Sequence, residues 1–381
     1  EVSGRNGAVK QAVLRLVDDA RNFATVRLVL VCRSFDLDSD PRLKSLKDGL
    51  GVAHVDVPLL DWSEDVEPLL VSRGKEASGF SERQKQLLCL PLNLAIFLEV
   101  GGVAAPSFDS RNDLFERLIE YKDRSVRHDR PVPWNLIAPL SILAEWMSDR
   151  QRLDAPKDVL ASYGGALNML ASEGLIVQSR EYVNFFHESF FDYVYARAFS
   201  TKRQSLLDLL TSTEQHLFRR TQVRQILEAL RQSDFARYIQ ELNAVLHSTS
   251  TRYHIKVAIA QWLGSLNDPS ATEREAVLAL DEEGEAFPLL VRYALLSSPG
   301  WFDILSVNGW VETNLAGDQQ GRRQSVLWWL SSIAGERSSQ VAGLLERWWS
   351  GDAEKAKSLL DWFATARRQK PDRALAELCE R

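Results

Sequence analysis

Cysteine is scarce in this sequence, and no disulfide or zinc-binding pattern is present. The 381 residues include three cysteines, Cys32, Cys89 and Cys379, which are far apart and odd in number. A disulfide framework needs paired cysteines, and a structural zinc site needs closely spaced Cys or His pairs. We therefore expect a cytoplasmic protein in a reducing compartment, with no metal site of this kind.

Long apolar runs and excess positive charge are also missing. No stretch approaches the ~18 apolar residues that a membrane span requires, so we expect no membrane partner. The net charge of −6 and the pI of about 5.7 argue against bulk binding to nucleic acid or anionic membranes. With 45% apolar and 26% charged residues, the composition is that of a folded protein. A chain of this length predicts roughly two to four domains.

The motifs of self-contained hydrolases are absent from the sequence as well. There is no GxxxxGK[ST] loop to cradle phosphates, no zinc-protease spacing of His and Glu, and no nucleophile elbow. The chain starts at Glu1 without a methionine and enters a helical pattern within a few residues. We therefore expect part of the protein, including any phosphate-binding loop, to lie upstream.

Residues 1–60 show the pattern of an α/β unit. Apolar residues recur at helical spacing from Ala8 to Asn22. The run RLVLVCRSF, Arg27 to Phe35, is continuously apolar at its centre, which is typical of a strand buried on both faces of a parallel sheet. VAHVDVPLL, Val52 to Leu60, is a second strand candidate. We interpret residues 1–60 as the end of an α/β nucleotide-binding domain.

Residues 61–128 read as a small helical domain. Trp62 to Ser72 opens with an Asp/Ser capping pair, and Asn112 to Asp123 is amphipathic. Between them, Ser81 to Val100 is a mostly apolar helix that Leu90-Pro91 interrupts.

Residues 129–200 follow the order of a winged helix. Helical patterns cover Trp134 to Ser148, Pro156 to Tyr163 and Gly165 to Glu173. GLIVQSREYVNFF, Gly174 to Phe186, then gives two short apolar runs around a polar turn, which predicts a β-hairpin.

Residues 201–381 contain only helical patterns separated by Asp-Pro, Ser-Pro-Gly and Gly-Asp breaks. Pairs of helices at this spacing predict a HEAT-like solenoid, and the fold as a whole is expected to be mostly α. Two tryptophan pairs, Trp328-Trp329 and Trp348-Trp349, lie near helix ends. We interpret them as packing between adjacent helices; a ligand-facing aromatic patch is the alternative.

Arg33 and Pro91 are two candidate ligand contacts. Arg33 ends the first predicted strand, and ligands of doubly wound sheets bind outside the carboxyl ends of strands. Its guanidinium could reach a phosphate, or it could form an ion pair in solvent. The ring of Pro91 could lie against a purine, or Pro91 could serve only to break the helix.

His187 is the third candidate, in the stretch NFFHESFFDYVYARAF. If a helix begins near His187, Phe190, Phe191 and Val194 share its face, which predicts a buried imidazole. The first turn of a helix also favours anions such as phosphate. A neutral core histidine bonded to a backbone carbonyl is the competing interpretation.

The order of these features resembles the STAND NTPases, which include NACHT proteins and plant resistance proteins. The resemblance covers roughly residues 1–200 and consists of a strand ending in Arg33, a helical domain with Leu90-Pro91-Leu92, and a winged helix with Phe186-His187 followed by Asp192-Tyr193. Cys89 departs from this pattern, since the family often has glycine there.

The resemblance implies a set of contacts with ATP or ADP and Mg²⁺. Arg33 would sense the γ-phosphate, Pro91 would pack on adenine, and His187 would contact the β-phosphate of ADP. Glu1 would be the final acidic residue of a Walker B motif and the candidate catalytic residue. The P-loop itself is not in this chain.

The same resemblance implies a signalling switch that is locked by ADP and activated by ATP, with hydrolysis resetting it. Four rings, those of Phe185, Phe186, Phe190 and Phe191, would hold the helix after His187 on its hairpin. The helical repeats would sense a trigger, an effector domain would lie upstream, and activation would drive homo-oligomerisation. Signalling or defence is the implied role.

Two other functions remain open on the sequence alone. Residues 201–381 would also suit a protein-binding scaffold without nucleotide dependence. A winged helix can instead belong to a DNA-binding regulator, which reads the major groove with its third helix. In this sequence the third helix, ALNMLASEG (Ala166 to Gly174), contains Glu173 and no Lys or Arg. Nucleic acid is therefore the weaker choice of partner.

Overall fold

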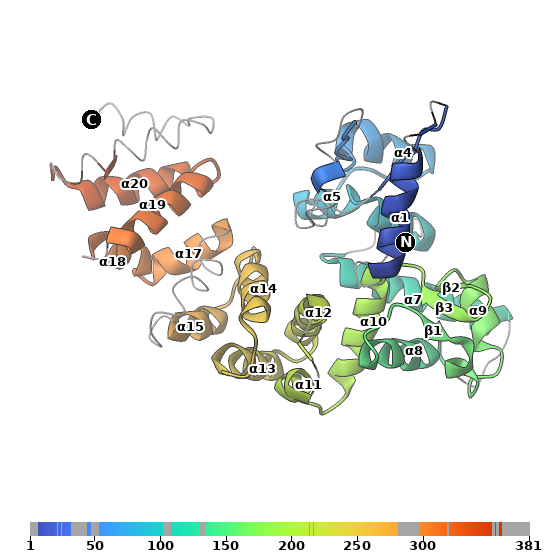
Figure 1. Cartoon of the computed structure of the whole chain (residues 1–381). Helices are drawn as coiled ribbons and strands as arrows, with labels where there is room; N and C mark the ends of the chain where they lie inside the picture. The colour runs from blue at the N-terminus through green and yellow to red at the C-terminus, as the bar shows by residue number, and fades with distance from the viewer. Residues whose placement is uncertain are drawn as a thin grey trace. The chain divides into compact units, whose positions relative to one another are not determined.

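The protein is mostly helical and divides into two compact units, Glu1–Asp109 and Ser110–Arg381 (Figure 1). In this computed structural model the residues described are 7–20, 22–23, 25–31, 44–46, 53–101, 108–129, 134–212, 214–215, 217–280, 298–317, 320–352, 355 and 358–359. The mostly-α fold class predicted from the sequence is confirmed for these residues.

The first unit contains α1 (Gly7–Ala20) and a group of short helices, namely η1 (Trp62–Val66), α4 (Glu67–Ser72), α5 (Glu82–Leu88) and α6 (Pro91–Val100). The carboxylate of Asp61 accepts hydrogen bonds from the amides of Ser63 and Glu64, so the predicted cap at this helix start is confirmed. Rings of Trp62, Phe80, Phe97 and Phe108 meet at centroid distances of 5.5–6.4 Å and form an aromatic core beneath these helices.

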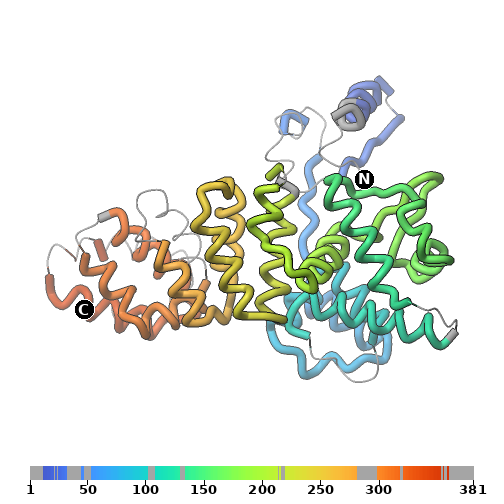
Figure 2. Tube along the Cα trace, turned by 90° about the horizontal axis from the view of Figure 1, so that it is seen from below, coloured from blue at the N-terminus to red at the C-terminus, as the bar shows by residue number. Residues whose placement is uncertain are grey.

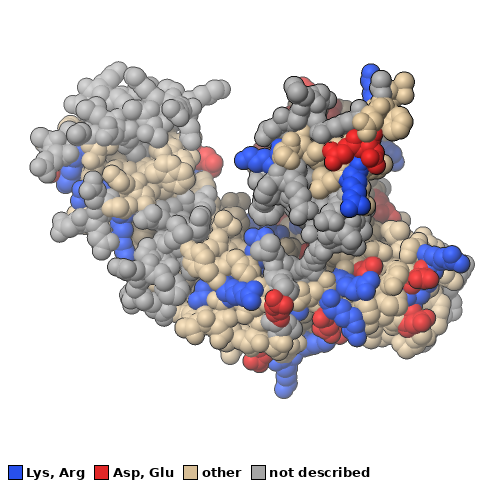
Figure 3. All heavy atoms as spheres, in the orientation of Figure 1, with Lys and Arg blue, Asp and Glu red and all other residues tan. Residues whose placement is uncertain are grey.

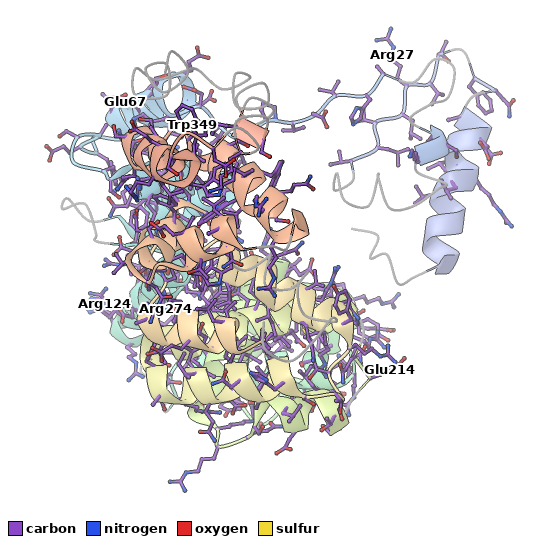
Figure 4. The ribbon with its side chains drawn as sticks, turned by 90° about the vertical axis from the view of Figure 1, so that its left-hand side faces the viewer. Arg27, Glu67, Arg124, Glu214, Arg274 and Trp349 are labelled. Atoms are coloured by element: carbon purple, nitrogen blue, oxygen red, sulfur yellow. The ribbon has the colours of Figure 1, made fainter. Side chains whose placement is uncertain are left out.

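The two strands predicted in this unit are not formed in the described residues. Residues 26–31 and 53–60 are extended without strand pairing, and Val29, Val31 and Val57 are 86–88% exposed. Arg27 is labelled on the first of these segments in Figure 4. The prediction of a buried strand at Arg27 is therefore wrong, because an apolar run favours burial but cannot supply the neighbouring strands that hydrogen bonding requires. Residues 32–35, including Arg33, lie outside the described part.

The second unit begins with α7 (Arg111–Asp129), a helix we had expected in the lid domain, followed by α8 (Ile137–Asp149). Next come β1 (Ala155–Pro156), η2 (Lys157–Leu160), α9 (Ala166–Ser172), β2 (Ile176–Gln178), β3 (Tyr182–Phe185) and α10 (Glu188–Thr201). The hairpin predicted over Gly174 to Phe186 is confirmed, with Val177 paired to Asn184. A third strand, β1, was not predicted; it pairs with β3 and gives an antiparallel sheet in the order β1-β3-β2.

The rest of the described chain is helical, as the sequence predicted. The helices are α11 (Leu206–Ser212), α12 (Leu217–Ser233), α13 (Phe235–His247), α14 (Tyr253–Gly264), α15 (Ala271–Ala279), α17 (Pro299–Val307), α18 (Trp310–Ala316), α19 (Gln320–Ile333) and α20 (Ser338–Trp349). Helix α12 packs on both α13 and α14, and α13 packs on α15, so successive helices lie side by side (Figure 2). None of the helices described has the length and apolar character needed to cross a bilayer.

The tryptophan pairs are largely part of this packing. Trp329 is wholly buried against Phe302 at a centroid distance of 5.8 Å, and the indole N–H of the buried Trp348 donates to the Leu315 carbonyl at 2.9 Å. Trp328 differs, because it is 63% exposed. The packing interpretation is confirmed for one member of each pair.

Candidate functional site

Of the four candidate site residues, the structure describes two, Pro91 and His187; Glu1 and Arg33 lie outside the described residues. Pro91 belongs to the first unit and His187 to the second. Their convergence on one nucleotide stays a prediction.

Pro91 starts a helix. It is exposed at the first position of α6, where a missing N–H costs no helical hydrogen bond. The preceding residue, Leu90, is extended and offers no side-chain cap. The buried Asn93 donates to the Leu87 carbonyl at 2.8 Å and fixes the turn between α5 and α6. The predicted interruption is confirmed, and it produces two separate helices instead of one kinked helix.

The turn before Pro91 also has a defined electrostatic setting. The carbonyl of Cys89 accepts a hydrogen bond from the Leu60 amide at 3.0 Å, so this turn is tied to the segment that leads into Asp61. Burial raises the pKa of the Cys89 thiol, and the negative charges of Asp61 and Asp65 raise it further. The thiol is therefore held neutral and is a poor nucleophile.

His187 is the N-cap of α10. Its backbone is extended, with φ −151° and ψ 143°, and its Nδ1 accepts a hydrogen bond from the Ser189 amide at 3.1 Å. Ser189 Oγ also lies 2.7 Å from Nδ1. Since Nδ1 accepts from an amide, a neutral ring carries its proton on Nε2. The predicted helix start is confirmed.

The predicted burial of His187 is wrong, because the residue is exposed. An N-cap lies outside the helix with an extended backbone, so helical spacing to Phe190 and Phe191 does not place it on their face. The amides of Phe190 and Phe191 both bond the His187 carbonyl at 3.2 Å, so they are not available to an anion. Any phosphate contact at this junction would use the imidazole.

The junction itself is held by aromatic packing, as predicted. Phe185 at the end of β3 contacts Phe190 and Phe191 at centroid distances of 5.9 and 5.6 Å, and Phe186 contacts Phe190 at 4.9 Å. Phe190 and Phe191 are buried on the core side of α10. The hairpin therefore fixes the first turn of α10.

Polar contacts then tie α10 to neighbouring helices along its length. The hydroxyl of the buried Tyr193 donates to Glu116 of α7, and Arg197 donates to the same carboxylate at 2.7 Å. Burial, followed by the hydrogen bond to Glu116, raises the pKa of Tyr193 far above its usual range. At the other end, Arg237 of α13 donates to the carbonyls of Ser200 and Gln204 at 2.8 and 2.9 Å. These contacts make α10 the helix that joins α7 to the later helices.

The polar contacts of this network could not be predicted from the sequence. Glu116 and Tyr193 are 77 positions apart, and neither belongs to a recognisable motif. The one signal was the run of aromatic residues after His187, which indicates a buried helix but not its polar partners.

Among the described residues, no metal site is evident, and the helix expected to read DNA lacks basic side chains. No group of three metal-ligating side chains occurs among them. Helix α9, the third helix before the hairpin, has no Lys or Arg, and Glu173 at its end pairs with Lys122 at 3.5 Å. On the face drawn in Figure 3, basic and acidic side chains are interspersed.

Comparison with known proteins does not assign a family. No protein-family model matches the chain, and no curated protein is significantly similar to it.

Proposed function

We propose that the chain is part of a nucleotide-dependent signalling switch of the STAND or NACHT type, locked by ADP and activated by ATP. The observation that carries this proposal is the place of His187. It caps α10 where the hairpin ends, and its Nδ1 accepts from the Ser189 amide, which in a neutral ring leaves the proton on Nε2. An imidazole N–H fixed in this way is a suitable donor to a phosphate oxygen.

The surrounding fold supports the same proposal. The order α8, β1, η2, α9, β2, β3, α10 is the order expected of a winged helix and supports that interpretation, and the packing of α12 to α15 is compatible with HEAT-like repeats. Pro91 is exposed at a helix start, where its ring could lie against adenine. Bound ATP or ADP with Mg²⁺ would supply the phosphate that His187 contacts, and Arg33 and Glu1 would complete the site.

The signal would travel through α10. Aromatic contacts fix its first turn to the hairpin, and Arg237 of α13 donates to the Ser200 carbonyl in its last turn. Loss of the His187–phosphate contact would release α10 together with α12 and α13, which pack on each other. The helical repeats would bind the trigger, and release would expose surfaces for homo-oligomerisation.

Two substitutions separate phosphate binding from helix capping. Asparagine at an N-cap can accept a hydrogen bond from the same amide but does not extend to the position of Nε2. Alanine can neither accept that hydrogen bond nor extend to that position. We expect both His187→Asn and His187→Ala to accelerate ADP release from the full-length protein by roughly tenfold or more, the loss of one strong hydrogen bond. Only His187→Ala should also lose about 1 kcal/mol of stability.

Bound nucleotide and ADP release rates, with thermal unfolding in parallel, are the measurements. His128→Asn, on the exposed end of α7, is the matched control and should behave as the unaltered protein. If His187→Asn keeps ADP as tightly as the unaltered protein, His187 is a helix cap without a role in the nucleotide site.

A further inference from the structure

Arg219 on α12 is a buried charge whose partners in the described part of the chain are all neutral. It has no exposed surface, and its Nη1 donates to Ser148 Oγ at 2.9 Å and to Gln222 Oε1 at 2.6 Å. Its Nε is fully covered and has no hydrogen-bond partner. Removing a charge from water costs free energy, and neutral acceptors offset that cost only in part.

A second arginine of the same helix has a full counter-ion. The side chain of Arg231 is 20% exposed, and it donates to both oxygens of the wholly buried Glu273 at 2.7 and 3.2 Å. The fold thus pairs this guanidinium of α12 with a carboxylate and gives Arg219, which is more deeply buried, none.

The end of α8 supplies what negative charge Arg219 receives. Ser148 lies in the last turn of α8, and its carbonyl accepts from Arg219 Nη2 at 3.5 Å and from the Gln151 amide at 3.1 Å. The carboxyl end of a helix dipole is equivalent to about half a unit charge. The positive charge of Arg219 is therefore only partly balanced.

The backbone directly after α8 is strained as well. Gln151 has a φ of 53°, in the left-handed region that residues other than glycine rarely adopt. Its side-chain amide donates to the Glu214 carbonyl at 3.3 Å, shortly before α12 begins at Leu217. Strain of this kind persists where surrounding contacts enforce it, and it is concentrated at functional and switch regions. Two independent strained features thus occur where the end of α8 meets the start of α12.

The direct contact between these two helices is polar. Ser148 Oγ also accepts from Gln222 Nε2 at 3.0 Å, so Ser148, Arg219 and Gln222 form one hydrogen-bonded group, and all three are wholly buried. Apart from this group, α8 and α12 each pack on α10, which lies between them in Figure 1. Water can replace the hydrogen bonds of such a group when it is exposed, so opening it costs less than opening an apolar contact.

We propose that Ser148, Arg219 and Gln222 form a strained latch, the α8–α12 latch, which opens when the start of α12 separates from the end of α8. Opening returns the guanidinium to water and releases the backbone of Gln151, so the open and closed forms differ little in free energy. A partner that binds the later helices then needs only a modest preference for the open form to populate it. This device lies within the second unit and does not require the nucleotide contacts proposed for His187.

Hydrogen exchange of the full chain without nucleotide, read by mass spectrometry, tests the latch. Arg219→Met keeps the length of the side chain and removes the charge. We expect it to unfold at the same temperature as the unaltered protein or higher, and to slow amide exchange in the last turn of α8 by roughly tenfold. Arg219→Lys keeps the charge with fewer donors and should accelerate the same exchange. An arginine that only stabilises the closed fold predicts faster exchange in both variants.

Arg231→Met is the matched control, because it leaves the buried carboxylate of Glu273 without its counter-ion. It should lower the unfolding temperature. The unaltered protein gives a further measurement that needs no variant. Its amides in the last turn of α8 should exchange roughly tenfold faster than those in the last turn of α14, a helix of similar length whose end is also buried.

Two outcomes would overturn the proposal. One is a lower unfolding temperature or faster exchange in Arg219→Met, which would mean that the buried charge stabilises the closed form. The other is equal exchange in the last turns of α8 and α14 of the unaltered protein, which would mean that the latch does not open. Neither measurement involves nucleotide, so either failure is distinct from a failure of the His187 proposal.

Discussion

The hydroxyl of Tyr238 on α13 donates a 2.7 Å hydrogen bond to Oε1 of Glu273, a carboxylate on α15 with no exposed surface. Arg231 of α12 bonds both oxygens of the same carboxylate at 2.7 and 3.2 Å, and the Ser270 amide completes the set at 2.7 Å. One buried acid thus joins three helices, and every one of its partners is a donor.

Replacing this acid should destabilise the fold. We expect Glu273→Gln to lower the free energy of unfolding by about 3 kcal/mol, because Arg231 loses its buried counter-ion and keeps only the exposed Asp268 at 3.5 Å. Glu275→Gln, two positions away and 70% exposed, should change it by less than about 0.5 kcal/mol. Urea unfolding of both variants measures the two changes in free energy of unfolding. Similar changes would mean that the buried carboxylate contributes no more stability than the exposed one.

The same carboxylate makes that difference depend on pH. Burial alone would raise the pKa of Glu273, but hydrogen bonds from Arg231, Ser270 and Tyr238 outweigh it and lower the pKa below 4.5. A carboxylate whose pKa is lower in the folded state contributes its full stabilisation when the pH is above its pKa in the unfolded state. That contribution is lost as the pH falls through its pKa in the folded state. The difference in free energy of unfolding between Glu273→Gln and the unaltered protein should therefore be largest at neutral pH and decrease below pH 4.5.

Cys89 should react slowly with thiol reagents. Burial and the charges of Asp61 and Asp65 raise its pKa, so little thiolate is present at mildly alkaline pH. Asp61→Asn removes one charge but keeps a capping oxygen for the Ser63 amide, and we expect faster alkylation of Cys89 in this variant. Peptide-level mass spectrometry separates Cys89 from the other cysteines.

Glu67→Gln in the neighbouring helix α4 is the control for this experiment, since Glu67 does not act on the thiol. An unchanged alkylation rate in Asp61→Asn would show that the charge of Asp61 does not protect Cys89.

The adjacent residues Trp328 and Trp329 offer a matched pair on α19. Trp329→Ala should cost roughly 3–5 kcal/mol of stability, because it empties a wholly buried site beside Phe302. Trp328→Ala, at a side chain 63% exposed, should cost less than about 0.5 kcal/mol. Thermal or urea unfolding gives both values, and equal losses would contradict the assignment of Trp329 to the core.

Much of the local structure could be predicted from the sequence, because helix signals act over a few residues. The cap at Asp61, the helix interruption at Pro91 and the start of α10 after His187 each depend on neighbours within one turn. The hairpin before α10 depends on a short polar turn between two apolar runs, which is also local.

Features that require a partner from elsewhere in the chain could not be predicted. The apolar run from Arg27 to Val31 predicts a buried strand, yet a strand forms only where another strand offers its hydrogen bonds. The exposure of His187 was not predicted either. A cap residue lies outside the helix, so its spacing to later residues does not place it on their face.

The sequence by itself determined where the helices and the hairpin lie, because hydrophobic period, proline and capping residues are read within one or two turns. Only the tertiary structure decided which charges meet. Glu273 accepts a hydrogen bond from Arg231, which is 42 positions away in the sequence, and Arg219 donates to Ser148, which is 71 positions away. Electrostatic pairing depends on distance in space, which a linear pattern of residues does not contain.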